Sequence, residues 1–314
     1  MSAIFGIIRR PGASVEETEL AAMSSSLRHR GPDGIHYSTR GHAGLGHCML
    51  CSTPESLREN LPFSDEISGL TITADARIDN REQLLADIPV RCRGGAIISD
   101  SQLILRAYMK WGESCVDYLL GDFAFAIWNE RTQALFLARD QMGCKPLYYH
   151  CSEGLLVFAS SANAVARVGQ VGATVDEGRI ADYLIEMEGL DQTGTWYREI
   201  SRMPPAHCVL YRGDAFRPLK YWELQPADSS HLKTDADYLE AFTEVYTEAV
   251  RSRLRCHKNP ASMLSGGLDS STVVALARDL LVAGGEPPLR VYSGISEEGS
   301  VCSETAAILS LIHI

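Results

Sequence analysis

The segment that most restricts the fold is a glycine-containing loop between a short apolar run and a helical stretch. It reads Met263-Leu264-Ser265-Gly266-Gly267-Leu268-Asp269-Ser270-Ser271. Adjacent glycines allow a tight turn and close approach of a ligand, and a helix start directs free N–H groups and its positive dipole end at the loop. With a further strand expected over 289–295, which contains Ser293, this order favours an α/β domain with a parallel sheet.

This loop is suited to bind an anion. Hydroxyls of Ser265, Ser270 and Ser271 can donate to phosphate oxygens, whereas Asp269 would repel a phosphate unless a cation lay between them. Asp269 is therefore a candidate ligand of Mg²⁺. The spacing and lysine of a Walker A loop are absent, and a glycine turn capped by serines is the alternative. The loop resembles the SGGxDS pyrophosphate loop of enzymes that form adenylates from ATP, and this resemblance implies that residues 264–271 and Ser293 bind ATP.

The first 223 residues have the pattern of a layered α+β domain. Turn signals such as those in 30–34 separate short apolar runs, which predict strands over 3–8, 43–50, 70–74, 123–128, 134–139 and 155–159. Helices are expected over 15–27, with Ser14 as N-cap, and over 101–111, with Asp100 as N-cap and Gly112 at the end. A polar stretch over 224–235 predicts a linker, so a second domain is expected over 236–308.

Several blocks in the first 220 residues resemble, in the same order, the class II glutamine amidotransferase domain of the asparagine synthetase family. They are Ile4-Phe5-Gly6, 28–34, Ser99-Asp100, 121–125 and 139–149. The resemblance implies an α+β N-terminal-nucleophile (Ntn) αββα sandwich. It also implies that the second domain is the start of an α/β adenine-nucleotide alpha-hydrolase-like (PP-loop) domain.

The residues that hydrolyse glutamine in this family are replaced here. Its nucleophilic cysteine corresponds to Ser2, a residue type that can act as an N-terminal nucleophile in other hydrolases. Its carboxylate-binding arginine corresponds to Met49, and its Asn-Gly-Glu motif reads Asp75-Ala76-Arg77. A carboxylate at an oxyanion site repels the charge that the site must stabilise. Although Asp100 matches the residue that binds the substrate amine, we expect an inactive glutaminase domain.

The family resemblance implies ATP-dependent amide-bond formation through an acyl-adenylate, with release of AMP and pyrophosphate. Residues 74–84 and 107–128 look most like the cyclases that close lasso-peptide macrolactams, and β-lactam synthetases are similar members that lack the cysteine. A lasso cyclase would have a precursor peptide and a leader peptidase as partners. Two alternatives stay open: asparagine synthesis from aspartate, with ammonia or with glutamine through Ser2, and a non-catalytic ATP-binding fragment.

Charge and composition exclude other classes of protein. The formal net charge of -11, from 40 acidic and 29 basic residues without a basic stripe, argues against nucleic acid as a partner. No apolar run could span a membrane, and nine scattered cysteines suit the cytoplasm. A homodimer is compatible with the family. Residues 309–314 match the translation of a sequencing adapter, so we expect them to be an artefact and the synthetase's catalytic residues to lie downstream of 308.

Overall fold

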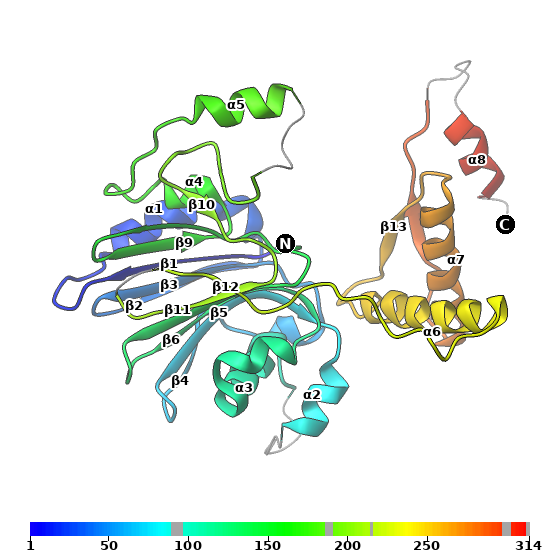
Figure 1. The fold of residues 1–314 in the computed structure, drawn as a ribbon, viewed down its shortest axis with the longest axis horizontal. Coiled ribbons are helices and arrows are strands. Elements are labelled where there is room, and N and C mark those ends of the chain that lie inside the picture. Colours follow the sequence, from blue (N-terminus) through cyan, green and yellow to red (C-terminus); the bar gives the residue numbers. More distant parts are fainter. Residues whose placement is uncertain (89–96, 186–190, 214–215, 297–302, 312–314) are drawn as a thin grey trace. The chain divides into compact units, whose positions relative to one another are not determined.

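The computed structural model describes residues 1–88, 97–185, 191–213, 216–296 and 303–311. The chain forms two units, one of residues 1–51 and 55–224 and the other of residues 52–54 and 225–314. The first unit contains two six-stranded sheets whose strand pairs are all antiparallel (Figure 1). The second contains a short parallel pair of strands.

Each sheet of the first unit combines pairs of consecutive strands with pairs of strands that lie far apart in the sequence. The first sheet has the order β10 (Ser201–Arg202), β8 (Tyr148–Ser152), β9 (Leu155–Ala159), β1 (Ala3–Arg9), β3 (Ala43–Met49) and β2 (Gly34–Arg40). The second has the order β12 (Leu219–Lys220), β11 (His207–Tyr211), β7 (Ala134–Arg139), β6 (Gly121–Asn129), β5 (Leu70–Ile78) and β4 (Phe63–Asp65).

Helices cover the outer face of each sheet (Figure 1). Against the first sheet pack α1 (Glu17–Leu27) and α4 (Ala162–Val165), and against the second packs α3 (Asp100–Trp111), beside α2 (Arg81–Asp87). Short 3-10 helices occur at Arg28–Arg30, Glu55–Arg58 and Gly112–Asp117. The layers are therefore helix, sheet, sheet and helix, which confirms the predicted sandwich.

Strand alternation explains why central strands are apolar on both faces. In β6, Phe123, Phe125 and Ile127 join the core beneath α3, whereas the alternate residues Ala124, Ala126 and Trp128 join the core between the sheets. All six side chains are at most 2% exposed. Complete burial of a large apolar side chain stabilises a fold by about 1.5–3 kcal/mol, so these strands fix the sandwich.

The structure also corrects some of the predicted boundaries. Helix α1 begins later than expected, because Glu16, and not Ser14, is its N-cap and forms a capping box with Glu19. Ser99 caps α3, and Gly112 ends it with a φ of +62°. Strand β5 continues beyond the predicted end at residue 74 and reaches Ile78, so Asp75 and its neighbours lie within a strand.

The second unit has an α/β order. It comprises α6 (Asp235–Arg253), β13 (Ala261–Met263), α7 (Leu268–Ala283), β14 (Arg290–Tyr292) and α8 (Ser303–Leu311). Strands β13 and β14 pair in parallel, with Met263 opposite Tyr292. The predicted artefact at 309–314 overlaps the end of α8, and its last residues, 312–314, lie outside the described residues. Among the helices that the structure describes, none has the length and apolar character required to cross a membrane.

Candidate functional site

The predicted phosphate loop connects β13 to α7. Its Gly266 has a φ of +83°, a left-handed conformation that disfavours side chains with a Cβ atom. A Cβ added there would lie 2.9 Å from the Cβ of Ala307 in α8 and 3.1 Å from the carbonyl oxygen of Glu304. Glycine therefore lets the loop turn while α8 packs against it.

The loop exposes backbone groups at the start of α7. The N-cap of this helix is Gly267, which contributes no side-chain cap, so the N–H groups of the first turn have no intrahelical acceptor. Serine hydroxyls organise the loop: Ser270 Oγ accepts a hydrogen bond from Ser265 N at 3.2 Å and lies 3.1 Å from Ser265 Oγ, and Ser271 Oγ donates to Gly267 O at 2.8 Å. This combination of free N–H groups and partly exposed hydroxyls fits a phosphate group.

The two other predicted residues of this site lie at compatible positions. Ser293 follows β14 directly, so it lies at the carboxyl end of the parallel pair, as the loop does. Asp269 is exposed in the first turn of α7. No cluster of three or more acidic, histidine or cysteine ligands exists among the described residues, so Asp269 would contribute one carboxylate. Because Mg²⁺ commonly takes one or two carboxylates together with phosphate oxygens and water, this arrangement fits Mg-ATP.

Ser2 is held by the backbone at the end of β3. Its Oγ accepts a hydrogen bond from Leu50 N at 3.0 Å and lies 3.3 Å from Leu50 O, to which it donates. The side chain is 7% exposed. The hydroxyl at the position of the family's nucleophile thus has a structural hydrogen-bonding role in this structure.

Asp75, the residue predicted at the family's oxyanion site, forms a buried ion pair. Asp75 Oδ1 lies 2.8 Å from Lys145 Nζ, and the two side chains are 5% and 12% exposed. Burial raises the pKa of the Asp75 carboxyl, while Lys145, the N-terminal amine and Arg30 act in the opposite direction. Asp75 Oδ2 and Arg30 Nη1 are buried and make no hydrogen bond within the described residues. This charge arrangement cannot stabilise an oxyanion in the way that paired N–H donors do.

The loop that follows β7 positions Lys145. Asp140 accepts hydrogen bonds from the N–H groups of Cys144 and Lys145 at 2.7 and 2.9 Å. The Arg139 guanidinium donates to the carbonyl oxygens of Gly143 and Lys145 at 2.6 and 2.7 Å. The family-like block over 139–149 therefore includes a tightly bonded turn that presents an ammonium group to Asp75.

The remaining predicted glutamine-site residues lie on adjoining elements. Met49 ends β3 and is 7% exposed, and Ala76 is partly buried in β5. Asp100, 4% exposed, accepts a hydrogen bond from Ile78 N at 3.3 Å and forms an ion pair with Arg81. The amine-binding role assigned to Asp100 remains a prediction, and its carboxylate already has these two partners.

Sequence reasoning did not identify Lys145 and Arg81 as parts of this region. Lys145 belongs to the block over 139–149, which indicated the family but no role for this residue. Arg81 lies in a short helix, and no sequence pattern relates it to Asp100. Both residues act through ion pairs with distant carboxylates, which a local pattern cannot reveal.

Comparison with known families and proteins agrees with this architecture. Residues 1–222 match the glutamine amidotransferase domain, and residues 241–309 match asparagine synthase. One solved structure with a similar fold is the glutamine PRPP amidotransferase from B. subtilis complexed with ADP and GMP, with a TM-score of 0.51 and 15% identity, covering 95% of this chain and 67% of that one.

Two curated proteins illustrate the sequence similarity. "Asparagine synthetase [glutamine-hydrolyzing] 3" of Bacillus subtilis is 29% identical over 93% of this chain and 47% of its own length. "Amidase chry2" of Gibberella zeae is 28% identical over 92% of this chain and 44% of its own length. The chain thus spans about half the length of these relatives. With the amidotransferase match over most of its length, the chain belongs to the asparagine synthase-like glutamine amidotransferase family.

Proposed function

We propose that the protein uses ATP to form an amide bond and takes no ammonia from glutamine. The observation that supports the absence of glutamine hydrolysis is the buried pair of Asp75 and Lys145, because the family resemblance assigns Asp75 to the position of the oxyanion donors. The replacement of the nucleophilic cysteine by Ser2 and of the glutamine-binding arginine by Met49 supports the same conclusion. We infer that the first unit has a structural role in the whole protein.

The second unit supports the ATP-dependent half of the proposal. Mg-ATP, when bound, would activate a carboxylate as an adenylate. The N–H groups at the start of α7 and the hydroxyls of Ser265, Ser270 and Ser271 would bind the phosphates that leave as pyrophosphate. Asp269 would hold Mg²⁺ next to them.

We further propose that the substrate is a lasso precursor peptide. An Asp or Glu side chain would be adenylated, and the peptide's N-terminal amine would displace AMP to close a macrolactam. Holding the two reacting groups together can contribute about 7–11 kcal/mol to lowering the barrier. This choice is supported by the resemblance of residues 74–84 and 107–128, and a leader peptidase would be the second partner. All the cysteines that the structure describes are free thiols, which supports our proposal of a cytoplasmic protein.

The test uses the protein that carries the complete asparagine synthase domain, incubated with Mg-ATP. Its substrates are a peptide with a free N-terminal amine and an internal Asp or Glu, and the same peptide with an acetylated amine. We expect AMP and a product lighter by one water only with the free amine. An Asp269→Asn variant should form neither product.

The second candidate function is asparagine synthesis, because curated relatives carry that name. It predicts AMP formation from aspartate and ammonia, and no dependence on a peptide. AMP formation from neither substrate would favour a non-catalytic ATP-binding protein. A homodimer remains a prediction under each of these proposals.

A further inference from the structure

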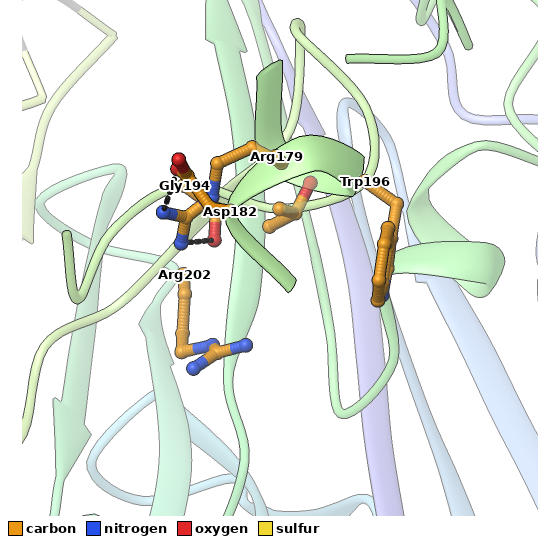
Figure 2. A pocket seen from close by; sticks show the side chains of 6 residues that line it. Arg179, Asp182, Gly194, Trp196 and Arg202 are labelled. Atoms are coloured by element: carbon orange, nitrogen blue, oxygen red, sulfur yellow. Dashed lines mark hydrogen bonds and ion pairs between the residues drawn. The ribbon is translucent and has the colours of Figure 1, made fainter. Parts of the chain in front are cut away.

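A cavity of about 110 Å³ lies beside the edge strand β10. It is lined by Arg179 and Asp182 from α5 (Glu177–Leu184), by Gly194, Thr195 and Trp196, and by Arg202 from β10 (Figure 2). None of these residues belongs to the glutamine-type pocket or to the phosphate loop. They therefore form a site to which the family resemblance assigns no role.

One of the two arginines in this cavity is already neutralised. Arg179 Nη1 lies 3.6 Å from Asp182 Oδ2, and its Nη2 donates to the carbonyl oxygen of Gly194 at 3.2 Å (Figure 2). Arg179 Nη1 also lies 3.7 Å from Asp191 Oδ2. These bonds attach α5 to the 191–194 turn. Arg179 thus builds the wall of the cavity.

The charge of the other arginine, Arg202, is not compensated. Its guanidinium makes no ion pair or hydrogen bond with any residue in the described ranges, and its Nε is buried. The group lies 5.6 Å from the centre of the Tyr148 ring, a weak attraction compared with a carboxylate. The nearby Arg139 is also cationic, and its pKa is lowered chiefly by burial and in part by Arg202. An anion bound to the guanidinium in the cavity would relieve this repulsion.

Among the other lining groups, Trp196 supplies an aromatic ring. Thr195 Oγ1 donates to Ile200 O at 2.7 Å, and Gly194 N donates to Asp191 Oδ2 at 3.0 Å, so both are used within the loop. Trp196 is 46% exposed and packs edge-on against Tyr183, with 5.3 Å between ring centres. Its ring offers a flat apolar surface that a ligand can cover.

We propose that this cavity binds a small organic carboxylate, with its carboxylate group on Arg202 and its apolar or aromatic part against Trp196. A planar carboxylate matches the fork of guanidinium donors. A phosphate would bring more negative charge close to Asp182 and has no apolar part to cover Trp196. The cavity volume admits a group of only a few atoms, so the remainder of the ligand extends over the exposed ring.

The test is a calorimetric titration of the chain with phenylacetate and with neutral phenylacetamide. We expect saturable binding of phenylacetate and at least about tenfold weaker binding of the amide, since a charge-assisted hydrogen bond is lost. Arg202→Gln should weaken phenylacetate binding by about 10- to 100-fold. Arg198→Gln is the matched control, because Arg198 is an exposed arginine of the same segment that does not line the cavity. Its affinity should stay within about twofold of wild type.

A second variant distinguishes a loss of ligand contacts from a loss of folded structure. Trp196→Ala alters an exposed ring and should weaken phenylacetate more than acetate, while circular dichroism stays unchanged. The proposal is overturned by equal affinity for acid and amide, by Arg202→Gln binding like wild type, or by the absence of saturable binding at millimolar phenylacetate. Inorganic phosphate binding as tightly as phenylacetate would also overturn it, because the site would then not select an apolar carboxylate.

Discussion

Replacing Lys145 by Met tests whether the buried ion pair supports the first unit. The substitution keeps a long side chain but removes the ammonium that lies 2.8 Å from Asp75 Oδ1. Removal of one partner leaves a buried carboxylate without compensation, which typically costs about 3–5 kcal/mol. The low exposure of both side chains, 5% and 12%, places this pair near the buried limit. In a unit of this size we expect the melting temperature to fall by about 6–20 °C.

The effect should depend on pH in a defined direction. Burial raises the folded-state pKa of Asp75, and Lys145 opposes that rise, so the variant should have a still higher folded-state pKa. For a carboxyl with a raised pKa, the stability contribution is complete below the unfolded pKa of about 3.9 and is lost as pH rises through the folded pKa. The variant should therefore be most destabilised at neutral pH and approach wild type as the pH is lowered towards the unfolded pKa.

Thermal and urea unfolding of both proteins, at neutral and at mildly acidic pH, measure this effect. Lys220→Met is the matched control, since Lys220 pairs with Glu223 at 2.9 Å but the two side chains are 49% and 65% exposed. It should change stability by less than about 1 kcal/mol. The double variant Asp75→Asn, Lys145→Met should recover most of the loss, because no buried charge remains unpaired. A Lys145→Met protein as stable as the control at neutral pH would refute this reasoning.

Three further predictions concern single residues. Ser2→Ala should destabilise the first unit by about 1 kcal/mol, through loss of the bonds to Leu50, without changing ammonia release; urea unfolding measures it. Gly266→Ala should weaken binding of Mg-ATP far more than Gly267→Ala, as calorimetric titration can measure. A Cβ atom at residue 266 would lie 2.9 Å from the Cβ of Ala307, whereas the atom nearest to a Cβ at residue 267 is Ser265 Oγ at 3.6 Å. Cys115 should resist alkylation at pH 8, because burial raises its pKa, while the exposed Cys144 should react, as peptide mass spectrometry can show.

The central strands were predictable because their local pattern is unambiguous. Strands β7 and β9 are buried at every position and have the bounds that the apolar runs indicate. Strand β8 was not predicted, because its residues Tyr148–Ser152 are partly polar and half-buried between β9 and the short edge strand β10. A half-buried strand with polar residues lacks the continuous apolar signal of a strand that is buried on both faces.

The candidate sites also differ in how far the sequence predicts them. The phosphate loop is a continuous segment with glycine and serine at fixed positions, so the sequence predicts both its shape and its ligand class. In β5, by contrast, Asp75 forms an ion pair with Lys145, which lies far along the chain in the turn after β7. Similarly, nothing local relates Arg202 to α5. Long-range charge pairing therefore becomes visible only in the folded chain.

The measurement that most directly tests the account is ammonia release from glutamine by the purified protein, with Ser2→Ala as the comparison. We predict that both proteins release ammonia only at the rate of the buffer, while the wild-type chain still binds Mg-ATP. Release by the wild type clearly above the Ser2→Ala protein would show that the Ser2 site hydrolyses glutamine, and would contradict the claim that the buried pair of Asp75 and Lys145 replaces that chemistry.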